Sequence, residues 1–206
     1  MAQTLKEEVK QNILRAAERE FAEAGYERAT MSGIARRAEI STGNIYRYFE
    51  DKDTLFYSVL PEEFPKRFLS LVKKRVESLI LAPNLLALDP HARQDAEALL
   101  SFWVEHRLKV ITLLDRAEGS RYSTFAQQFV DVMLKPTLAS LEQQMGSSTL
   151  SPVARSLLEQ LFKNTVRTIV SILEAHDQES DIRIAFAGFW SYQLAGLAGF
   201  RTWVCS

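Results

Sequence analysis

The chain has 206 residues, of which 47% are hydrophobic and 25% are charged. This composition excludes an intrinsically disordered chain and allows a sizeable core, in one large domain or two smaller ones. The 25 basic and 26 acidic residues leave a formal net charge of −1, so the global charge indicates no nucleic-acid partner.

Cysteine use and hydropathy indicate a reducing compartment. Cys205 is the only cysteine, which excludes an internal disulfide and is typical of the cytosol. The N-terminus is polar and lacks the apolar core of a signal peptide. The most apolar stretch, Ala185 to Val204, is interrupted by polar residues and by Arg201, so we expect a buried helix there and no membrane contact. The expected location is the cytoplasm.

The first predicted helix runs from about Leu5 to Ala24, and Gly25 ends it as a left-handed cap. Between residues 29 and 58 the pattern indicates two short helices, a tight turn between them, and a third helix. The second of these, about Thr42 to Tyr48, lies below the roughly 12 residues at which isolated helices become marginally stable. Apolar neighbours must hold it: Ile34, Ala35, Ala38, Ile40, Ile45, Phe49 and Leu55.

The other face of this short helix is polar. Hydrogen-bonding groups and flat rings on such a small rod suit the major groove of DNA. From Arg28 to Lys52, five basic and three acidic residues leave a local charge of +2, which alone would bind DNA weakly in a monomer. The exposed residues are expected to be Thr42, Asn44, Tyr46, Arg47 and Tyr48.

Residues 9 to 60 resemble the DNA-binding domain of the tetracycline-repressor-like (TetR) family of bacterial transcription regulators. In that family a Thr opens the second helix, a small residue and a Tyr lie on the recognition helix, and an aromatic pair precedes a Lys. The chain departs from the pattern at Gly33, where the family usually has an acidic residue that completes a capping box, so we expect a less firmly started helix. The matching residues are Thr30, Gly43, Tyr46, Tyr48-Phe49 and Lys52.

The resemblance implies specific DNA contacts. Tyr46 and Lys52 would contact phosphates, Lys52 at the start of the fourth helix; the alternative is a packed aromatic ring and a solvated lysine. Thr30, Met31 and Ser32 would offer backbone N–H or hydroxyl groups to a phosphate, although Thr30 could also be a plain helix cap. Base edges would be read by Thr42, Asn44 and Arg47, Gly43 would allow close approach, and Tyr48 could offer its hydroxyl.

The rest of the chain predicts further helices and no strand, so the fold class is all-α. A break or bend is expected at Pro61 and Pro65, and a cap at Ser151 before Pro152. We expect a helix-turn-helix DNA-binding domain of three helices at 1–55 and a helical effector-binding and dimerisation domain at 56–206. The other expected segments are a helix to Leu81, a loop at 83–90, one or two helices at 92–118, a helix at 120–145 kinked at Pro136, a turn at 146–149, and helices at 152–176 and 180–203.

Small residues recur at steps of three and four along the last helix, which lets another helix come close. Because the family dimerises through its final two helices, the resemblance implies a homodimer; close packing within one chain is the alternative. The candidate interface residues are Gly188, Ser191, Tyr192, Ala195 and Gly199, with Leu157, Leu161, Asn164 and Thr168 on the penultimate helix.

The middle of the chain is rich in aromatic and hydrogen-bonding residues. They could line a pocket for a small, largely apolar effector, or belong to the core. Basic groups there would suit an anionic compound. The candidate ligand contacts are Phe102, Trp103, His106, Arg107, Arg121, Tyr122, Phe125 and Phe129.

Catalytic motifs are missing from the sequence. It has no HExxH, GxSxG or GxGxxG pattern, so we expect no enzyme, no cofactor and no metal. The expected function is a regulator that binds a palindromic operator in double-stranded DNA. We expect the regulator to repress transcription, since no segment that would contact RNA polymerase is visible in the sequence. A ligand-independent DNA-binding regulator and a helical protein-interaction adaptor remain as alternatives.

Overall fold

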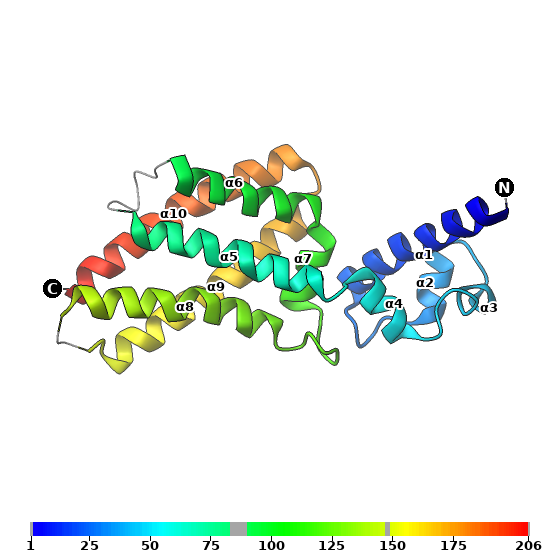
Figure 1. Cartoon of the computed structure of the whole chain (residues 1–206), viewed down its shortest axis with the longest axis horizontal. Coiled ribbons are helices and arrows are strands. Elements are labelled where there is room, and N and C mark those ends of the chain that lie inside the picture. The colour runs from blue at the N-terminus through cyan, green and yellow to red at the C-terminus, as the bar shows by residue number, and fades with distance from the viewer. Residues whose placement is uncertain (1, 83–89, 147–148, 206) are drawn as a thin grey trace. The chain divides into compact units, whose positions relative to one another are not determined.

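The computed structural model describes residues 2–82, 90–146 and 149–205 (Figure 1). Over these ranges the chain forms helices and no strand, which confirms the all-α prediction. The predicted loop at 83–90 and turn at 146–149 fall largely outside the described residues. The helices are α1 (Ala2–Ala24), α2 (Met31–Arg37), α3 (Thr42–Ile45), α4 (Lys52–Val59), α5 (Glu63–Leu81), α6 (Pro90–Glu105), α7 (Arg107–Asp115), α8 (Phe125–Gln144), α9 (Pro152–Ala175) and α10 (Glu179–Cys205).

The chain divides into two compact units. The first contains residues 1–66 and 107–126, and the second contains residues 67–106 and 127–206. The chain passes between them inside α5, at the break between α6 and α7, and inside α8. The boundary between a DNA-binding domain at 1–55 and an effector-binding and dimerisation domain at 56–206 stays a prediction.

A buried aromatic cluster holds the first unit together. The Phe21 and Phe56 rings meet edge to face with centroids 4.8 Å apart, and Tyr26 lies 4.7 Å from Phe56. Each fully buried Phe contributes about 1.5–3 kcal/mol through removal of apolar surface from water. The apolar residues expected to hold the short helix are buried, except Ile40, which is half-buried.

Several helix boundaries differ from those predicted. After Ile45 the chain tightens into a turn, because Arg47 N–H donates to Asn44 and Tyr48 N–H to Ile45 (3.1 and 3.0 Å), the spacing of a 3₁₀ turn. α8 starts at Phe125 rather than just after Gly119, since hydrogen-bonded turns occupy the residues between. α4 and α5 are separate helices, as one of the two predicted options required.

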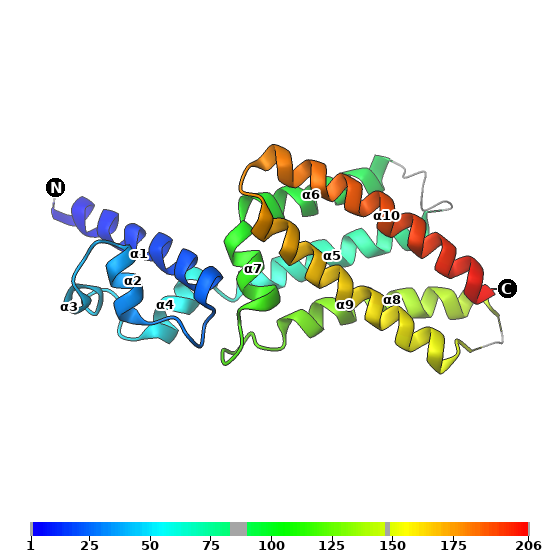
Figure 2. The same ribbon diagram turned by 180° about the vertical axis from the view of Figure 1, so that it is seen from behind.

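The second unit is a helical bundle around a core of large rings. Phe68 and Phe186 are fully buried, and Trp103 packs against Phe186 with centroids 4.9 Å apart. α8 continues through Pro136. Figure 2 shows α9 and α10 side by side on one face of this unit. Among the described residues, no helix is both long and apolar enough to cross a membrane.

We predict that Glu39→Gly stabilises the first unit. Glu39, in the turn between α2 and α3, has a φ of 57°, a left-handed conformation that costs an L-residue about 1–2 kcal/mol. Glycine removes this cost but adds about 0.4–1 kcal/mol of unfolded-state entropy, so urea unfolding should show a net gain of about 0.5 kcal/mol. Glu50→Gly, at an exposed position without a positive φ, is the control. Equal shifts for the two variants would contradict the prediction.

Candidate functional site

Side-chain caps fix the starts of α2 and α3. Thr30 Oγ1 accepts a hydrogen bond from the Gly33 N–H (3.0 Å), and Ser41 Oγ accepts one from the Asn44 N–H (3.2 Å). Each cap satisfies an N–H that the helix itself cannot pair, and losing one costs about 1 kcal/mol. The cap at Thr30 is confirmed, whereas its contact with DNA stays a prediction.

Gly33 makes room for a carboxylate from α1. A Cβ at this position would lie 2.6 Å from Glu20 Oε1, closer than real Cβ contacts come. The other oxygen, Glu20 Oε2, pairs with Arg37 Nε at 3.2 Å. Negative charge is favourable at the first turn of a helix. A carboxylate therefore lies beside the first turn of α2, but it comes from α1 and its ion pair is with Arg37.

The predicted DNA contacts lie mostly on the exposed side of the helix-turn-helix. Tyr46 is 51% exposed, and the Arg47 guanidinium has no hydrogen bond or ion pair among the described residues. The Met31 side chain is 7% exposed, so only its backbone N–H is available. Thr30, Ser32, Thr42 and Gly43 are exposed, and Asn44, Tyr48 and Lys52 are half-buried.

Gly43 is not required by packing within the chain. A Cβ there would meet no atom within 4 Å. The open space in front of α3 therefore leaves room for the close approach of another molecule, as the prediction for this residue needs. Arg37 differs from Arg47, because Glu20 and Glu23 bind its guanidinium and offset its charge.

Lys52 has structural partners that the sequence did not predict. Its Nζ donates to the carbonyl oxygens of Tyr26 (2.8 Å) and Glu27 (3.3 Å), and lies 4.4 Å from the Tyr26 ring centroid. The Tyr26 hydroxyl donates to the Asp53 carboxylate; burial and this bond raise the pKa of Tyr26. Lys52 thus ties the start of α4 to the α1–α2 loop. An ammonium has a third N–H, so a phosphate contact stays compatible.

The segment Arg107–Ala126 is bound to the same unit as the helix-turn-helix. The Arg121 N–H donates to the Tyr57 hydroxyl (3.0 Å), and the Tyr122 hydroxyl donates to the Leu60 carbonyl (3.1 Å). The Arg121 guanidinium carbon also lies 3.9 Å from the Tyr57 ring centroid. These contacts fasten the α7–α8 connection to the end of α4.

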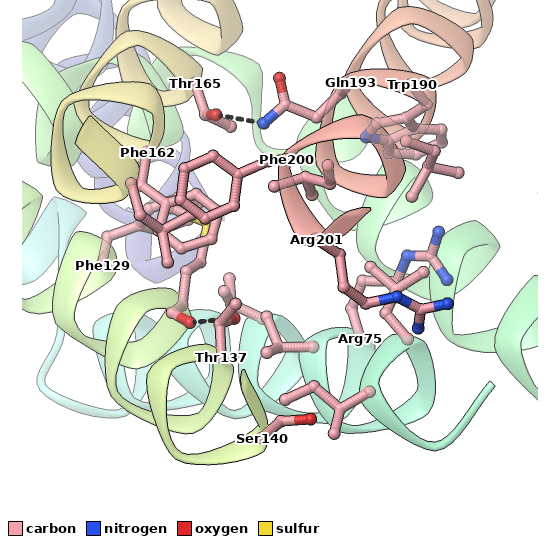
Figure 3. A pocket seen from close by; sticks show the side chains of 18 of the residues that line it. Arg75, Phe129, Thr137, Ser140, Phe162, Thr165, Trp190, Gln193, Phe200 and Arg201 are labelled. Carbon is pink, nitrogen blue, oxygen red and sulfur yellow. Dashed lines mark hydrogen bonds between the residues drawn. The ribbon is translucent and has the colours of Figure 1, made fainter. Parts of the chain in front are cut away.

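A cavity of about 150 Å³ lies within the second unit (Figure 3). α5, α6, α8, α9 and α10 all contribute to its walls, and most of the lining side chains are apolar. A cavity of about this size accepts a ligand of roughly the dimensions of benzene.

The predicted ligand contacts are distributed over both units. Trp103 and Phe129 line the cavity. Phe102 does not, and packs its ring against Phe68 and His106, with centroids 5.3 and 4.9 Å apart. As ligand contacts, all of these residues stay predictions. The predicted contacts that belong to the first unit are Arg107, Arg121, Tyr122 and Phe125.

The basic groups that do line the cavity, Arg75 and Arg201, were not among the predicted contacts. Arg75 lies between Val72 and Val76 on the buried face of α5 and is 6% exposed. A single basic residue on an otherwise apolar helix stripe is a signal that could have identified it. Arg201 interrupts the apolar last helix in the same manner.

The glycines of α10 do not pack closely within the chain. A Cβ at Gly188 or Gly199 would meet no atom within 4 Å, and Ile184 and Tyr192 on the same helix are 71% and 77% exposed. Packing inside one chain, the alternative explanation for this stripe, therefore does not account for these glycines. The other predicted interface residues, Leu157, Leu161, Asn164, Thr168, Ser191 and Ala195, are exposed or half-buried.

Comparison with known proteins agrees with this architecture. Residues 13–59 match the sequence model of the bacterial regulatory proteins of the tetR family. The transcriptional regulator Mb3439c of Mycobacterium bovis is 31% identical over 186 residues, which cover 84% of this chain and 93% of that protein. The chain belongs to the tetR family.

Other similarities cover different shares of this TetR-family chain. The regulator HbdR of Aromatoleum sp. is 36% identical over 102 residues, 46% of this chain and 44% of HbdR, so the match spans less than half the length of that relative. A solved TetR-like transcriptional regulator from Rhodococcus sp. RHA1 has a TM-score of 0.53 and 22% identity, covering 93% of this chain and 96% of that one. This last similarity shows the fold.

We predict that Lys52→Met destabilises the first unit by about 1–2 kcal/mol, because two charge-assisted hydrogen bonds to carbonyls are lost. Methionine keeps an apolar stem beside Tyr26. Chemical unfolding followed by circular dichroism measures the effect. Lys10→Met, at an exposed position of α1, should change little; similar losses for both variants would show that the two carbonyl contacts contribute nothing.

Proposed function

We propose that this chain is a sequence-specific, DNA-binding transcriptional regulator, and that it acts as a homodimeric repressor on a palindromic operator. The observation that carries the proposal is the exposed side of α3. A short rod is held in place by buried neighbours. In the turn that follows it, the exposed Arg47 guanidinium has no hydrogen bond or ion pair among the described residues. Such groups are available to base edges in a major groove.

The contacts divide into two chemical kinds. Arg47 suits guanine and Asn44 suits adenine, and both would specify sequence. Tyr46, Lys52 and the capped start of α2 would contact phosphates, which position the protein without reading sequence. A gel shift with genomic fragments tests whether the chain binds DNA with sequence preference. Absence of any preferred fragment would favour the helical protein-interaction adaptor.

We infer a dimer because a single DNA-binding unit would have low affinity for DNA. A local excess of two positive charges provides little affinity, and linking two such units raises it through effective concentration. Two-fold symmetry also matches a palindrome. We assign the interface to the exposed stripe of α9 and α10, which includes Gly188 and Tyr192.

An effector in the cavity would act through the helices that continue into the first unit. α5 and α8 each contribute lining residues and each begin in the first unit. Recognition helices of a dimer must lie about 34–36 Å apart to enter successive major grooves. A ligand releases DNA if it binds more tightly to a dimer whose recognition helices have a different spacing than to the DNA-binding dimer. A DNA-binding regulator of this kind would work in the cytoplasm.

We predict that Arg47→Ala relaxes sequence preference at one or two base pairs, by about 1–3 kcal/mol of discrimination, because a base contact is removed. Selection of operators from a random DNA pool, followed by titration against single-base variants, measures this. Arg36→Ala removes an exposed guanidinium from α2 and should leave base preference intact. Unchanged preference in Arg47→Ala would show that this face does not read bases.

We also predict that Gly188→Asp gives monomers that bind the operator at least tenfold more weakly. A Cβ at this position meets no atom of its own chain within 4 Å, so we expect the fold to tolerate the substitution, whereas a partner helix would bury the charge. Sedimentation velocity reports the oligomeric state. Ser70→Asp, exposed on α5, should remain dimeric. A dimeric Gly188→Asp variant would place the interface elsewhere.

A further inference from the structure

The cavity in the second unit is positively charged. Arg75 and Arg201 are its charged lining residues, and no Asp or Glu is among the described residues that line it. Figure 3 shows both arginine side chains on the same side of the cavity, away from the pair formed by Thr165 and Gln193. An apolar cavity with two guanidinium groups and no carboxylate favours an anionic occupant.

Arg75 is buried and forms no ion pair within 4 Å among the described residues, although the charge of Asp95 also acts on it. It is 6% exposed, and its hydrogen-bond partner among the described residues is the Ala92 carbonyl, 2.9 Å from Nη1. Burial lowers its pKa, but a guanidinium stays protonated in proteins. The carbonyl dipole and the charge of Asp95, which forms no ion pair with Arg75, offset only part of the buried full charge. An oxyanion within the cavity would complete the compensation.

A second donor in the cavity wall lacks a partner. Trp103 lines the cavity and is 2% exposed, yet its indole Nε1 has no hydrogen-bond acceptor among the described residues. A buried N–H without an acceptor costs about 1–3 kcal/mol, unless a ligand supplies one. In contrast, Gln193 Nε2 donates to Thr165 Oγ1 at 2.8 Å, so these two groups satisfy each other.

Apart from Thr137, Ser140 and Gln144, the remaining lining side chains are apolar, and they set the form of the ligand. Leu141, Phe162 and Leu194 are among the lining residues contributed by three different helices. A volume of about 150 Å³ accommodates a compact body of about six to eight carbon atoms. We infer that the cavity binds an amphipathic anion, whose apolar body fills the cavity and whose carboxylate, or an equivalent oxyanion, binds Arg75 and Arg201. This inference rests on the proposed effector role of the cavity and names the chemical class of the effector.

Isothermal titration of the purified full chain, without DNA, tests the ligand class. The probes are octanoate, octyl phosphate, 1-octanol and octylamine, which share an apolar chain and differ in the head group. Octanoate should bind at least tenfold more tightly than 1-octanol, and octylamine more weakly than both. If octyl phosphate binds more tightly than octanoate, the anion is a phosphate monoester; if it binds more weakly, the anion is a carboxylate. Equal affinity for octanoate and 1-octanol, or no octanoate binding at millimolar concentration, would overturn the inference.

Variants locate the head group. Arg201→Gln and Arg75→Gln should each weaken octanoate binding at least tenfold and leave 1-octanol binding unchanged. Arg155→Gln is the control. Arg155 is exposed on α9 and pairs with Glu142 of α8, so this variant should bind octanoate like the parent. Since Arg75→Gln could disturb the bond between α5 and α6, the half-buried Arg201 decides: unchanged affinity in Arg201→Gln would refute the assignment.

The titration and the operator experiments fail independently. Because the titration contains no DNA, a chain that binds octanoate but no operator would retain the ligand site and lose the proposed function. A chain that binds an operator but discriminates no anion would retain the function and lose the ligand class.

Discussion

The exposed face of α3 depends on tertiary contacts, because this helix is too short to be stable by itself in water. Four helical residues cannot offset the cost of nucleating a helix, so tertiary contacts must position them. Ile45 and Phe49 are buried for this purpose, and Ser41 caps the first turn. Because buried residues and the backbone hold α3 in place, its exposed side chains are not needed for packing. They are available to contact another molecule.

The distribution of compensated and uncompensated positive charge distinguishes structural from functional residues. Arg37 is bound by Glu20 and Glu23, and Lys52 is bound by backbone carbonyls. The Arg47 guanidinium, by comparison, has no hydrogen bond or ion pair among the described residues. The buried Arg75 donates a hydrogen bond to one carbonyl and has the charge of Asp95 acting on it without an ion pair. Arg37 and Lys52 therefore have structural partners. Arg47 and Arg75 are the basic side chains that we expect to meet an anionic partner, nucleic acid for Arg47 and a small molecule for Arg75.

Features that depend on neighbouring residues could be predicted from the sequence, and features that depend on distant ones could not. The caps at Thr30 and Ser151, the break before α5 and the buried side of α2 follow from local spacing. The carboxylate beside Gly33 comes from α1, and the partners of Lys52 come from the α1–α2 loop, so only the fold reveals them. Likewise, aromatic residues indicated the region of the cavity through Trp103 and Phe129. Its two arginines stand out in the sequence as basic residues within apolar helices, but only the fold shows that Arg75 and Arg201 line one cavity.

The helix-turn-helix belongs to a compact unit that is not one continuous stretch of sequence. Residues 107–126 complete it, through contacts such as the bond from Tyr26 N–H to the Arg116 carbonyl at 2.8 Å. A chimera that joins the first 66 residues to a foreign effector domain would therefore lack part of its own packing surface. An exchange of this unit between relatives would therefore need both segments, residues 1–66 and 107–126, to be transferred together.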